Sequence, residues 1–283
     1  MVIGIVYDRV RWDEKALIQE GEKNNIPLKL IDSKRYYLDT MKIHPDFQDI
    51  DVFLMRCVSA IRGQYWTQIL ESYGKKVVNT YDTYIKCVDK LTTTLALIKA
   101  NIPTPYTSIA FDVEKSIEAT ESLGYPAFLK PVLGSWGRLI SILKDPQSAK
   151  AIFEHRREMG AFYKTMYIQE GINIKNRDIR SFVIGNDVVC AIYRTSPQGE
   201  WRTNTAGGGK ASICPVTDEI RDISLKAAKA VGGGILGVDL FEDPKRGLLV
   251  NEVNQTCEYH NTVPLTGVNI PLHMLNYCLN LVK

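Results

Sequence analysis

Hydrophobic and polar positions alternate in blocks along the first eighty residues of the chain. Short apolar runs such as 2–7 and 51–56 have the composition of buried strands, and longer stretches with apolar residues at helical spacing separate them. Strands that alternate with helices are typical of a parallel, doubly wound sheet. We therefore predict an α/β fold that begins with such a sheet. The predicted strands are 2–7, 27–31, 51–56 and 76–79, and the predicted helices are 12–24 and 63–73.

A proline-rich break follows a long predicted helix over 81–101. Prolines 103 and 105 cannot continue this helix, because proline lacks the backbone N–H and disfavours helical geometry in the residue before it. A second α/β unit follows, and the pattern becomes rich in strands from residue 166. We expect three parts, an N-terminal one at 1–85, a central one at 86–165 and a C-terminal one at 166–283. Their predicted strands are 106–111, 126–131, 139–143, 166–170, 178–184, 187–193, 238–242 and 250–254, and their helices are 113–124, 146–159, 217–231 and 271–281.

Composition and charge exclude several classes of protein. The amino terminus becomes acidic too soon for a signal peptide, and no apolar run reaches the roughly 18 residues of a membrane span. Six scattered cysteines without a CxxC pair predict reduced, buried thiols in a cytoplasmic protein and argue against a zinc site. A net charge of +3 is too small to indicate a nucleic-acid partner. We expect neither nucleic acid nor a membrane as a partner.

Two apolar runs near the carboxyl end carry Asp239, Glu252 and Asn254. The turn at 243–247 predicts that the runs form a hairpin, which would bring Asp239 beside Glu252. Glu252 and Asn254 share one strand face because strand side chains alternate with period two. All three are oxygen ligands of the kind that magnesium takes together with substrate phosphates. The alternative is a surface hairpin with solvated acids, which the flanking apolar residues disfavour.

A second candidate site lies around Lys130, which ends an apolar strand. A buried lysine needs an anionic partner, because an unpaired charge in a low-dielectric site is heavily penalised. The loop that follows, 132–138, contains two glycines that let backbone N–H groups approach a phosphate, and it ends at Arg138. The sequence contains no Walker motif, and an ordinary hairpin turn fits this loop equally well.

Other polar residues point to the same chemistry less strongly. Lys90 lies on a helix, where a solvated lysine is the default, and the strand end at Gln169 and Glu170 offers backbone groups to an adenine edge. Arg180 and Arg194 lie on two strands expected to pair, and arginine suits carboxylate or phosphate recognition. The loop 201–209 is polar, basic and rich in glycine, as a loop over an anionic site or a plain surface loop would be. Without a candidate for covalent catalysis, lysines, arginines and magnesium-type ligands indicate phosphoryl chemistry by charge stabilisation.

The order of these motifs resembles the ATP-grasp superfamily of carboxylate–amine ligases and, within it, the RimK-like branch with the LysX/ArgX enzymes. The resemblance rests on Gly-Ile-Val-Tyr-Asp near the start, Arg-Cys-Val-Ser at 56–59, Lys-Pro-Val-x-Gly-Ser-Trp-Gly-Arg at 130–138 and Leu-Leu-Val-Asn-Glu-Val-Asn at 248–254. It covers essentially the whole chain. It implies an ATP-grasp fold behind an N-terminal doubly wound (pre-ATP-grasp) domain, with ATP and Mg²⁺ as cofactors. It further implies a homo-oligomer whose partners are an amino acid and LysW, a small acidic amino-group carrier protein.

The resemblance also implies a role for each matching residue. ATP would phosphorylate the carboxylate of the carrier's terminal glutamate, and the α-amino group of an amino acid would attack the acyl phosphate. Arg202 would stabilise charge on the transferred phosphate, and Asp239, Glu252 and Asn254 would hold magnesium. The implied ATP-binding residues are Lys90, Lys130, Gly134, Ser135, Trp136, Gly137, Arg138, Gln169, Glu170, Asp178, Arg180 and Asn204. The implied substrate-binding residues are Arg194, Thr205, Ala206, Glu258, Tyr259, His260, Asn261 and Thr262.

The choice of amino acid rests on the segment 258–262. Members of this branch take α-aminoadipate or glutamate, which differ by one methylene, a difference worth only about 1–3 kcal/mol in a fitted pocket. Asn261 followed by Thr262 resembles the α-aminoadipate type, and the glutamate type carries Gly-Phe there, so we expect α-aminoadipate and a place in lysine biosynthesis. Glutamate ligation to the carrier in arginine biosynthesis, RimK-type ligation to another protein and a non-catalytic nucleotide-binding module remain the alternatives.

Overall fold

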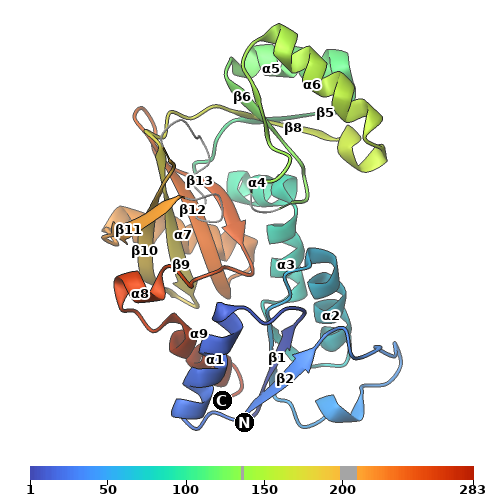
Figure 1. Ribbon diagram of the computed structural model, residues 1–283, viewed down its shortest axis with the longest axis vertical. Coiled ribbons are helices and arrows are strands. Elements are labelled where there is room, and N and C mark those ends of the chain that lie inside the picture. The colour runs from blue at the N-terminus through green and yellow to red at the C-terminus, as the bar shows by residue number, and fades with distance from the viewer. Residues whose placement is uncertain (135–136, 198–208) are drawn as a thin grey trace.

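The computed structural model describes residues 1–134, 137–197 and 209–283, which form three sheets with flanking helices (Figure 1). The first sheet is parallel, in the order β2-β1-β3-β4, as the alternating pattern predicts. No helix among these residues is long and apolar enough to cross a membrane. The strands of this sheet are β1 (Ile3–Tyr7), β2 (Leu28–Asp32), β3 (Val52–Met55) and β4 (Lys76–Val78), and its helices are α1 (Trp12–Lys23), α2 (Ala60–Ser72) and the 3₁₀ turn Pro45–Phe47.

The single helix predicted over 81–101 is wrong, because the chain forms α3 (Tyr81–Val88) and α4 (Lys90–Lys99) instead. Asp89 separates them with extended backbone, and its side chain caps α4 by accepting a hydrogen bond from the Thr92 N–H at 2.8 Å. Lys90 N–H then donates to the Val132 carbonyl at 3.0 Å. Pairing with the loop after Lys130 therefore takes the place of a helical hydrogen bond.

The central sheet is antiparallel, in the order β5-β8-β6-β7, with α5 and α6 packed beside it. The sequence pattern assigned β8 to the C-terminal part, but β8 lies between β5 and β6. We therefore propose that the boundary between the central and C-terminal parts follows β8. The elements are β5 (Thr107–Ala110), α5 (Val113–Leu123), β6 (Ala127–Lys130), β7 (Ser141–Leu143), α6 (Pro146–Glu158), the 3₁₀ turn Ala161–Lys164 and β8 (Met166–Glu170).

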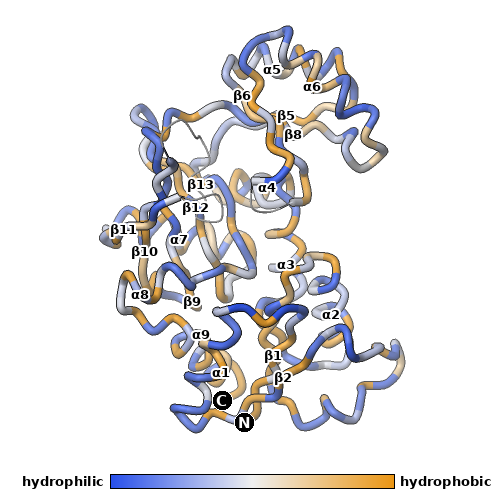
Figure 2. Tube along the Cα trace, in the orientation of Figure 1, coloured by the Kyte–Doolittle hydropathy of each residue, from blue (hydrophilic) through white to orange (hydrophobic). Residues whose placement is uncertain are grey.

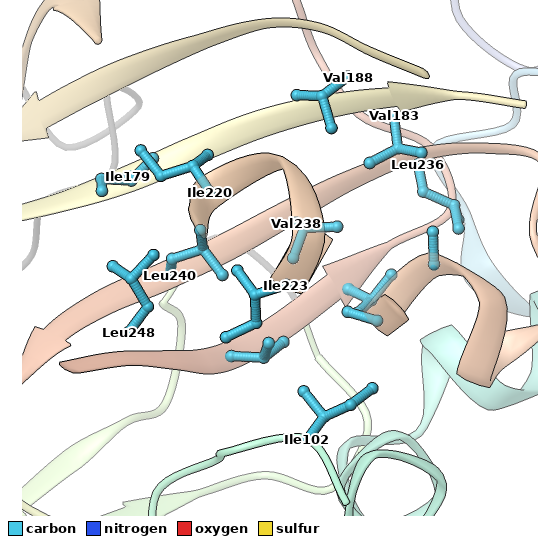
Figure 3. Close-up of a cluster of buried hydrophobic side chains, with 14 of the residues drawn as sticks. Ile102, Ile179, Val183, Val188, Ile220, Ile223, Leu236, Val238, Leu240 and Leu248 are labelled. Atoms are coloured by element: carbon cyan, nitrogen blue, oxygen red, sulfur yellow. The ribbon is translucent and has the colours of Figure 1, made fainter. Parts of the chain in front are cut away.

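The third sheet is antiparallel, in the order β11-β10-β9-β12-β13, with α7 (Asp218–Val231) against one face. Ile220 and Ile223 recur at helical spacing and pack on Val238 and Leu240 of the sheet (Figure 3). Thr217 caps the start of α7, and Gly232 ends it in a left-handed conformation. The strands are β9 (Arg177–Ile184), β10 (Asp187–Thr195), β11 (Lys210–Cys214), β12 (Ile235–Asp243) and β13 (Gly247–Asn254), followed by α8 (Val263–Thr266) and α9 (Ile270–Asn280).

The N-terminal and C-terminal parts share a core. The helix α9 contacts α1, β1 and β3, and its Met274 belongs to one buried cluster with Ile5 and Phe182. Hydrophobic residues follow the strands throughout the chain, whereas many of the connecting loops are hydrophilic (Figure 2). Asn79 adds a polar link, because its side chain hydrogen-bonds both backbone groups of Ile235. These contacts hold the strand ends of different parts around one cavity.

Candidate active site

A cavity of about 510 Å³ lies among the three sheets. Cys57 and Val58 line it from the N-terminal part, Lys130 from the central sheet and Asp239 from the C-terminal sheet. Most described residues of the sequence-predicted site reach this one space. They are Lys90, Lys130, Gly134, Gly137, Arg138, Gln169, Glu170, Asp178, Arg180, Arg194, Asp239, Glu252, Asn254, Glu258, His260, Asn261 and Thr262.

The predicted acidic hairpin is present. Asp239 of β12 lies opposite Glu252 of β13, and Asn254 Nδ2 lies 3.5 Å from Asp239 Oδ2. The pairing shifts register after Asp239, so that Leu240 lies opposite Val250. Asn251 is the extra residue of this bulge, and it lines the same cavity as its neighbour Glu252. Strict alternation would place Asn251 on the other face, which is why the sequence did not predict it.

Buried arginines compensate the charge of Asp239. Arg180 binds both oxygens of this carboxylate, and Arg194 Nη2 lies 3.0 Å from Oδ2. Arg194 also makes two hydrogen bonds of 2.7 Å to Asp178. Burial would raise the pKa of Asp239, but the two arginines outweigh it and lower that pKa. Two acids and two arginines thus form one group of opposite charges with little access to solvent.

The two predicted phosphate-binding lysines differ in their surroundings. Lys90 Nζ lies 3.1 Å from Glu252 Oε1 and donates to the Gly134 carbonyl at 2.8 Å. Lys130 is buried, and its ammonium donates to amide oxygens of Gln169 and, at 3.0 Å, Asn251. Burial, with a further contribution from Lys90, lowers the pKa of Lys130 to about 8. Lys130 therefore carries the least compensated of these charges.

Asp239, Glu252 and Asn254 are the candidate magnesium ligands. Two carboxylates and an amide oxygen are hard donors of the kind Mg²⁺ takes beside water and phosphate oxygens, so the chemistry of the set fits the ion. The described residues contain no group of three or more His, Cys, Asp or Glu side chains placed for a metal. That result agrees with a set in which the third ligand is an asparagine.

At the strand end formed by Gln169 and Glu170, the Glu170 side chain already has hydrogen-bond partners within the chain. Glu170 Oε1 accepts hydrogen bonds of 2.6 Å from the Tyr106 N–H and from Arg246 Nη2. Arg246 also lies over the Tyr106 ring, at 4.7 Å from its centroid. No local pattern singles out Arg246, because it belongs to the turn of the acidic hairpin and reaches the central sheet only in the folded chain.

The segment after the hairpin lines the cavity at Glu258, His260, Asn261 and Thr262. Tyr259, predicted with them, does not line it: the side chain is buried and its hydroxyl donates to the Asp13 carbonyl at 2.7 Å. Arg11 is a lining residue that the sequence did not predict, and it forms an ion pair with Glu258.

Six predicted site residues lie outside the described residues. They are Ser135 and Trp136 of the glycine-bearing loop, and Arg202, Asn204, Thr205 and Ala206 of the basic loop.

Family models cover nearly the whole chain. The RimK-like ATP-grasp domain matches residues 87–278, and the LysX preATP-grasp domain matches residues 3–85. The chain belongs to the RimK-like ATP-grasp family. This membership confirms the fold class expected from the motifs, an ATP-grasp fold behind an N-terminal preATP-grasp domain. The RimK-like family is a family of ligases, and ATP-grasp ligases use ATP, typically with Mg²⁺.

Within the RimK-like family, the chain is similar over nearly its full length to ligases named for LysW. The chain is 41% identical to the α-aminoadipate–LysW ligase LysX of Saccharolobus solfataricus, across 96% of this chain and 99% of that protein. It is 33% identical to the glutamate–LysW ligase ArgX of Sulfurisphaera tokodaii, across 98% of each chain.

Solved structures share the fold of this chain. The RimK domain ATP-grasp protein of Sphaerobacter thermophilus superposes with a TM-score of 0.77 at 22% identity, across 99% of this chain and 100% of that one. The D-alanine–D-alanine ligase of Bacillus anthracis, complexed with ATP, gives 0.71 at 18% identity, across 100% and 98%. At these identities the likeness supports the fold alone.

Proposed function

We propose that the protein is an ATP-dependent ligase that joins the α-amino group of α-aminoadipate to the carrier protein LysW. The acceptor is the side-chain carboxylate of the carrier's C-terminal glutamate, activated as an acyl phosphate. The observation that carries this proposal is the single cavity in which Lys90, Lys130 and two arginines face the acidic hairpin. The names of the full-length relatives supply the substrate class.

Phosphate binding falls to the lysines at one end of the cavity. Lys90 and Lys130 present ammonium groups from α4 and β6, and the Val132 carbonyl ties the start of α4 to the loop after Lys130. A polyphosphate would exchange with the amide acceptors of Lys130 and restore full charge compensation there. Gly134, Gly137 and Arg138, which line the cavity, would contact the phosphates, and the strand end at Glu170 would meet the adenosine.

Magnesium would be held by Asp239, Glu252 and Asn254 and would neutralise developing charge on the transferred phosphate. The chain's own contribution beside it is a fixed set of charges. Arg180 and Arg194 are already oriented by Asp239 and Asp178, so they need little reorganisation when negative charge develops nearby.

The chemistry needs two steps in order. A carboxylate oxygen of the carrier attacks the γ-phosphorus of ATP, the bond to the bridging oxygen breaks, and ADP leaves. The neutral α-amine then attacks the acyl carbon, phosphate leaves with the bonding electrons, and the amine loses a proton to water or a phosphate oxygen. A closed cavity serves this sequence because an acyl phosphate hydrolyses in water.

The choice of α-aminoadipate rests on two observations. Asn261 and Thr262, which resemble the α-aminoadipate type, both line the cavity. Three relatives named as α-aminoadipate–LysW ligases are 36–41% identical to the chain, and two named as glutamate–LysW ligases are 33% identical.

A ligation assay tests the proposal. The protein is incubated with ATP, Mg²⁺ and a LysW-type carrier, and either α-aminoadipate or glutamate is added. We expect ADP release that depends on both the carrier and α-aminoadipate, together with a carrier mass increased by one amino acid less water. Faster ligation of glutamate would move the chain to the ArgX type, and modification only of another protein's carboxyl terminus would favour the RimK-type reaction. Binding of ATP without ADP release in any mixture would refute the ligase.

A further inference from the structure

Arg11, in the loop between β1 and α1, has two carboxylate partners at the cavity. Its guanidinium donates from Nε and Nη2 to Glu14, at 3.0 and 2.8 Å, and from Nη1 to Glu258 Oε1 at 2.7 Å. The two acids differ in access to solvent. The Glu14 side chain is 1% exposed and that of Glu258 is 28% exposed. Arg11 therefore has one interior partner and one partner at the surface of the cavity.

A second arginine fixes the interior partner. Arg56 is buried and donates to Glu14 Oε1 at 3.1 Å and to the Cys257 carbonyl at 3.1 Å. Burial would raise the pKa of Glu14, but Arg11 and Arg56 hold that pKa below its usual value. Glu14 thus stays charged and holds the guanidinium of Arg11 in one plane, with the Nη1 edge directed at Glu258. A guanidinium held in this way is preorganised for a carboxylate.

We propose that Nη1 of Arg11 binds the side-chain carboxylate of the amino-acid substrate, and that Glu258 occupies this position until the substrate displaces it. The inference rests on the proposed function and deepens it by naming the residue that recognises a dicarboxylic amino acid. It makes Arg11 a specificity-determining residue contributed by the N-terminal part.

The rest of the cavity supports this assignment. Three other cations of the cavity wall pair with different acids, Lys90 with Glu252, Arg180 with Asp239, and Arg194 with Asp178 and Asp239. The ion pairs of Arg11 share no residue with these, so Arg11 and its two acids form a separate group.

A further unused group lies on the wall beside Glu258. Thr256 lines the cavity, and its hydroxyl is buried without a hydrogen-bond partner among the described residues. It is a second donor for a bound carboxylate, adjacent in sequence to the segment 257–262.

A purely structural ion pair between distant segments is the competing explanation. Arg11 and Glu258 are 247 residues apart and join the N-terminal part to the C-terminal part. Such a pair would affect stability and all substrates alike. A recognition role would affect only substrates that carry the second carboxylate.

The test compares α-aminoadipate with 2-aminohexanoate, which carries a methyl group in place of the distal carboxylate, at saturating ATP and carrier. A charge-assisted hydrogen bond corresponds to about a 10- to 100-fold change in affinity. We expect Arg11→Met to raise the KM for α-aminoadipate by about that factor, with kcat and the KM for 2-aminohexanoate within about threefold. Glu258→Gln should lower the KM for α-aminoadipate, a gain that a damaged fold would not produce. Arg221→Met, which removes an exposed ion pair with Asp187, is the matched control.

Three results would overturn the inference. One is an equal effect of Arg11→Met on both amino acids. Another is a raised KM for the carrier with an unchanged KM for the amino acid, and the third is a higher KM for α-aminoadipate in Glu258→Gln. Wild-type ligation decides the proposed function separately. If the wild type ligates neither amino acid, calorimetric binding of α-aminoadipate to the wild type and Arg11→Met still tests the inference, and equal binding refutes it.

Discussion

The buried ammonium of Lys130 predicts that nucleotide binding weakens as the pH rises through 8. Its pKa is lowered to about 8, first by burial and then by the nearby Lys90, and its two acceptors are neutral amide oxygens. A bound polyphosphate would supply the missing negative charge and return the pKa towards its unperturbed value of about 10.4. Binding would therefore take up a proton wherever the free protein has already lost it.

The size of this effect follows from linkage between the two pKa values. A shift from about 8 to about 10.4 corresponds to about 3 kcal/mol, and it makes the dissociation constant rise about tenfold between pH 7 and pH 9. Proton uptake per nucleotide should increase from about 0.1 to about 0.9 over the same interval. Folding has the opposite pH dependence, because folding lowers this pKa whereas nucleotide binding raises it. The folded pKa lies below the unfolded one, so the stability contribution of Lys130 rises between about pH 8 and 10.4 and is lost as the pH falls through 8.

Titration calorimetry with a non-hydrolysable ATP analogue, in buffers of different ionisation enthalpy, measures both quantities. Lys130→Arg is the control, because a guanidinium stays charged throughout this interval and leaves only the titration of the nucleotide and other groups. The difference between the two proteins isolates Lys130. If wild type and Lys130→Arg show the same proton uptake at pH 9, Lys130 does not meet the phosphates and the reasoning fails.

Three further predictions concern the metal, the buried ion pairs and the thiols. Asn254→Ala removes one candidate ligand and should raise the Mg²⁺ concentration for half-maximal ATP turnover by about tenfold or more, and an unchanged requirement would contradict the metal assignment. Arg194→Met leaves Asp178 without its bidentate partner and should lower the free energy of unfolding in urea by about 3 kcal/mol, whereas Arg221→Met should change it by less than about 0.5 kcal/mol. The six cysteines are free and buried, and burial raises the pKa of Cys57 to about 12, so a thiol reagent at pH 8 should modify six thiols in denaturant and react slowly with the native protein. Rapid native labelling would refute the burial of the thiols.

Local patterns sufficed for the elements whose side chains follow a regular period. The hairpin that joins Asp239 to Glu252 could be predicted because apolar runs, turn residues and strand alternation all agree there. Asn251 escaped prediction because a one-residue bulge turns it towards the face of Glu252, and no local signal marks a bulge. The helix break at Asp89 was missed for a similar reason. It depends on pairing with residues 132–133, which the sequence around Asp89 does not contain.

Contacts between residues far apart in the sequence set the other limit on what the sequence can predict. Arg11 and Arg246 are ordinary surface arginines in sequence, and only the folded chain brings them to Glu258 and Glu170. The assignment of β8 to the C-terminal part fails to anticipate its position between β5 and β6, because strand order depends on pairings across about sixty residues. Patterns therefore predict local elements and which side chains reach one cavity better than they predict the distant partners of those side chains.

Most of the described charged side chains around the cavity are already paired before any ligand binds, which has a consequence for its chemistry. Lys90 is paired with Glu252, Arg180 and Arg194 with Asp239, and Arg11 with Glu258. A phosphate, metal ion or amino acid that enters must exchange with a partner already in place, so its net gain is the difference between two charge-assisted contacts. Small differences of this kind favour correct ligands without excessive affinity for any one of them. Lys130 differs from these cations, since its ammonium donates to neutral amide oxygens, and its lowered pKa can be measured. Phosphate binding therefore gains most free energy at Lys130, because the hydrogen-bond acceptors of its ammonium in the free protein are neutral.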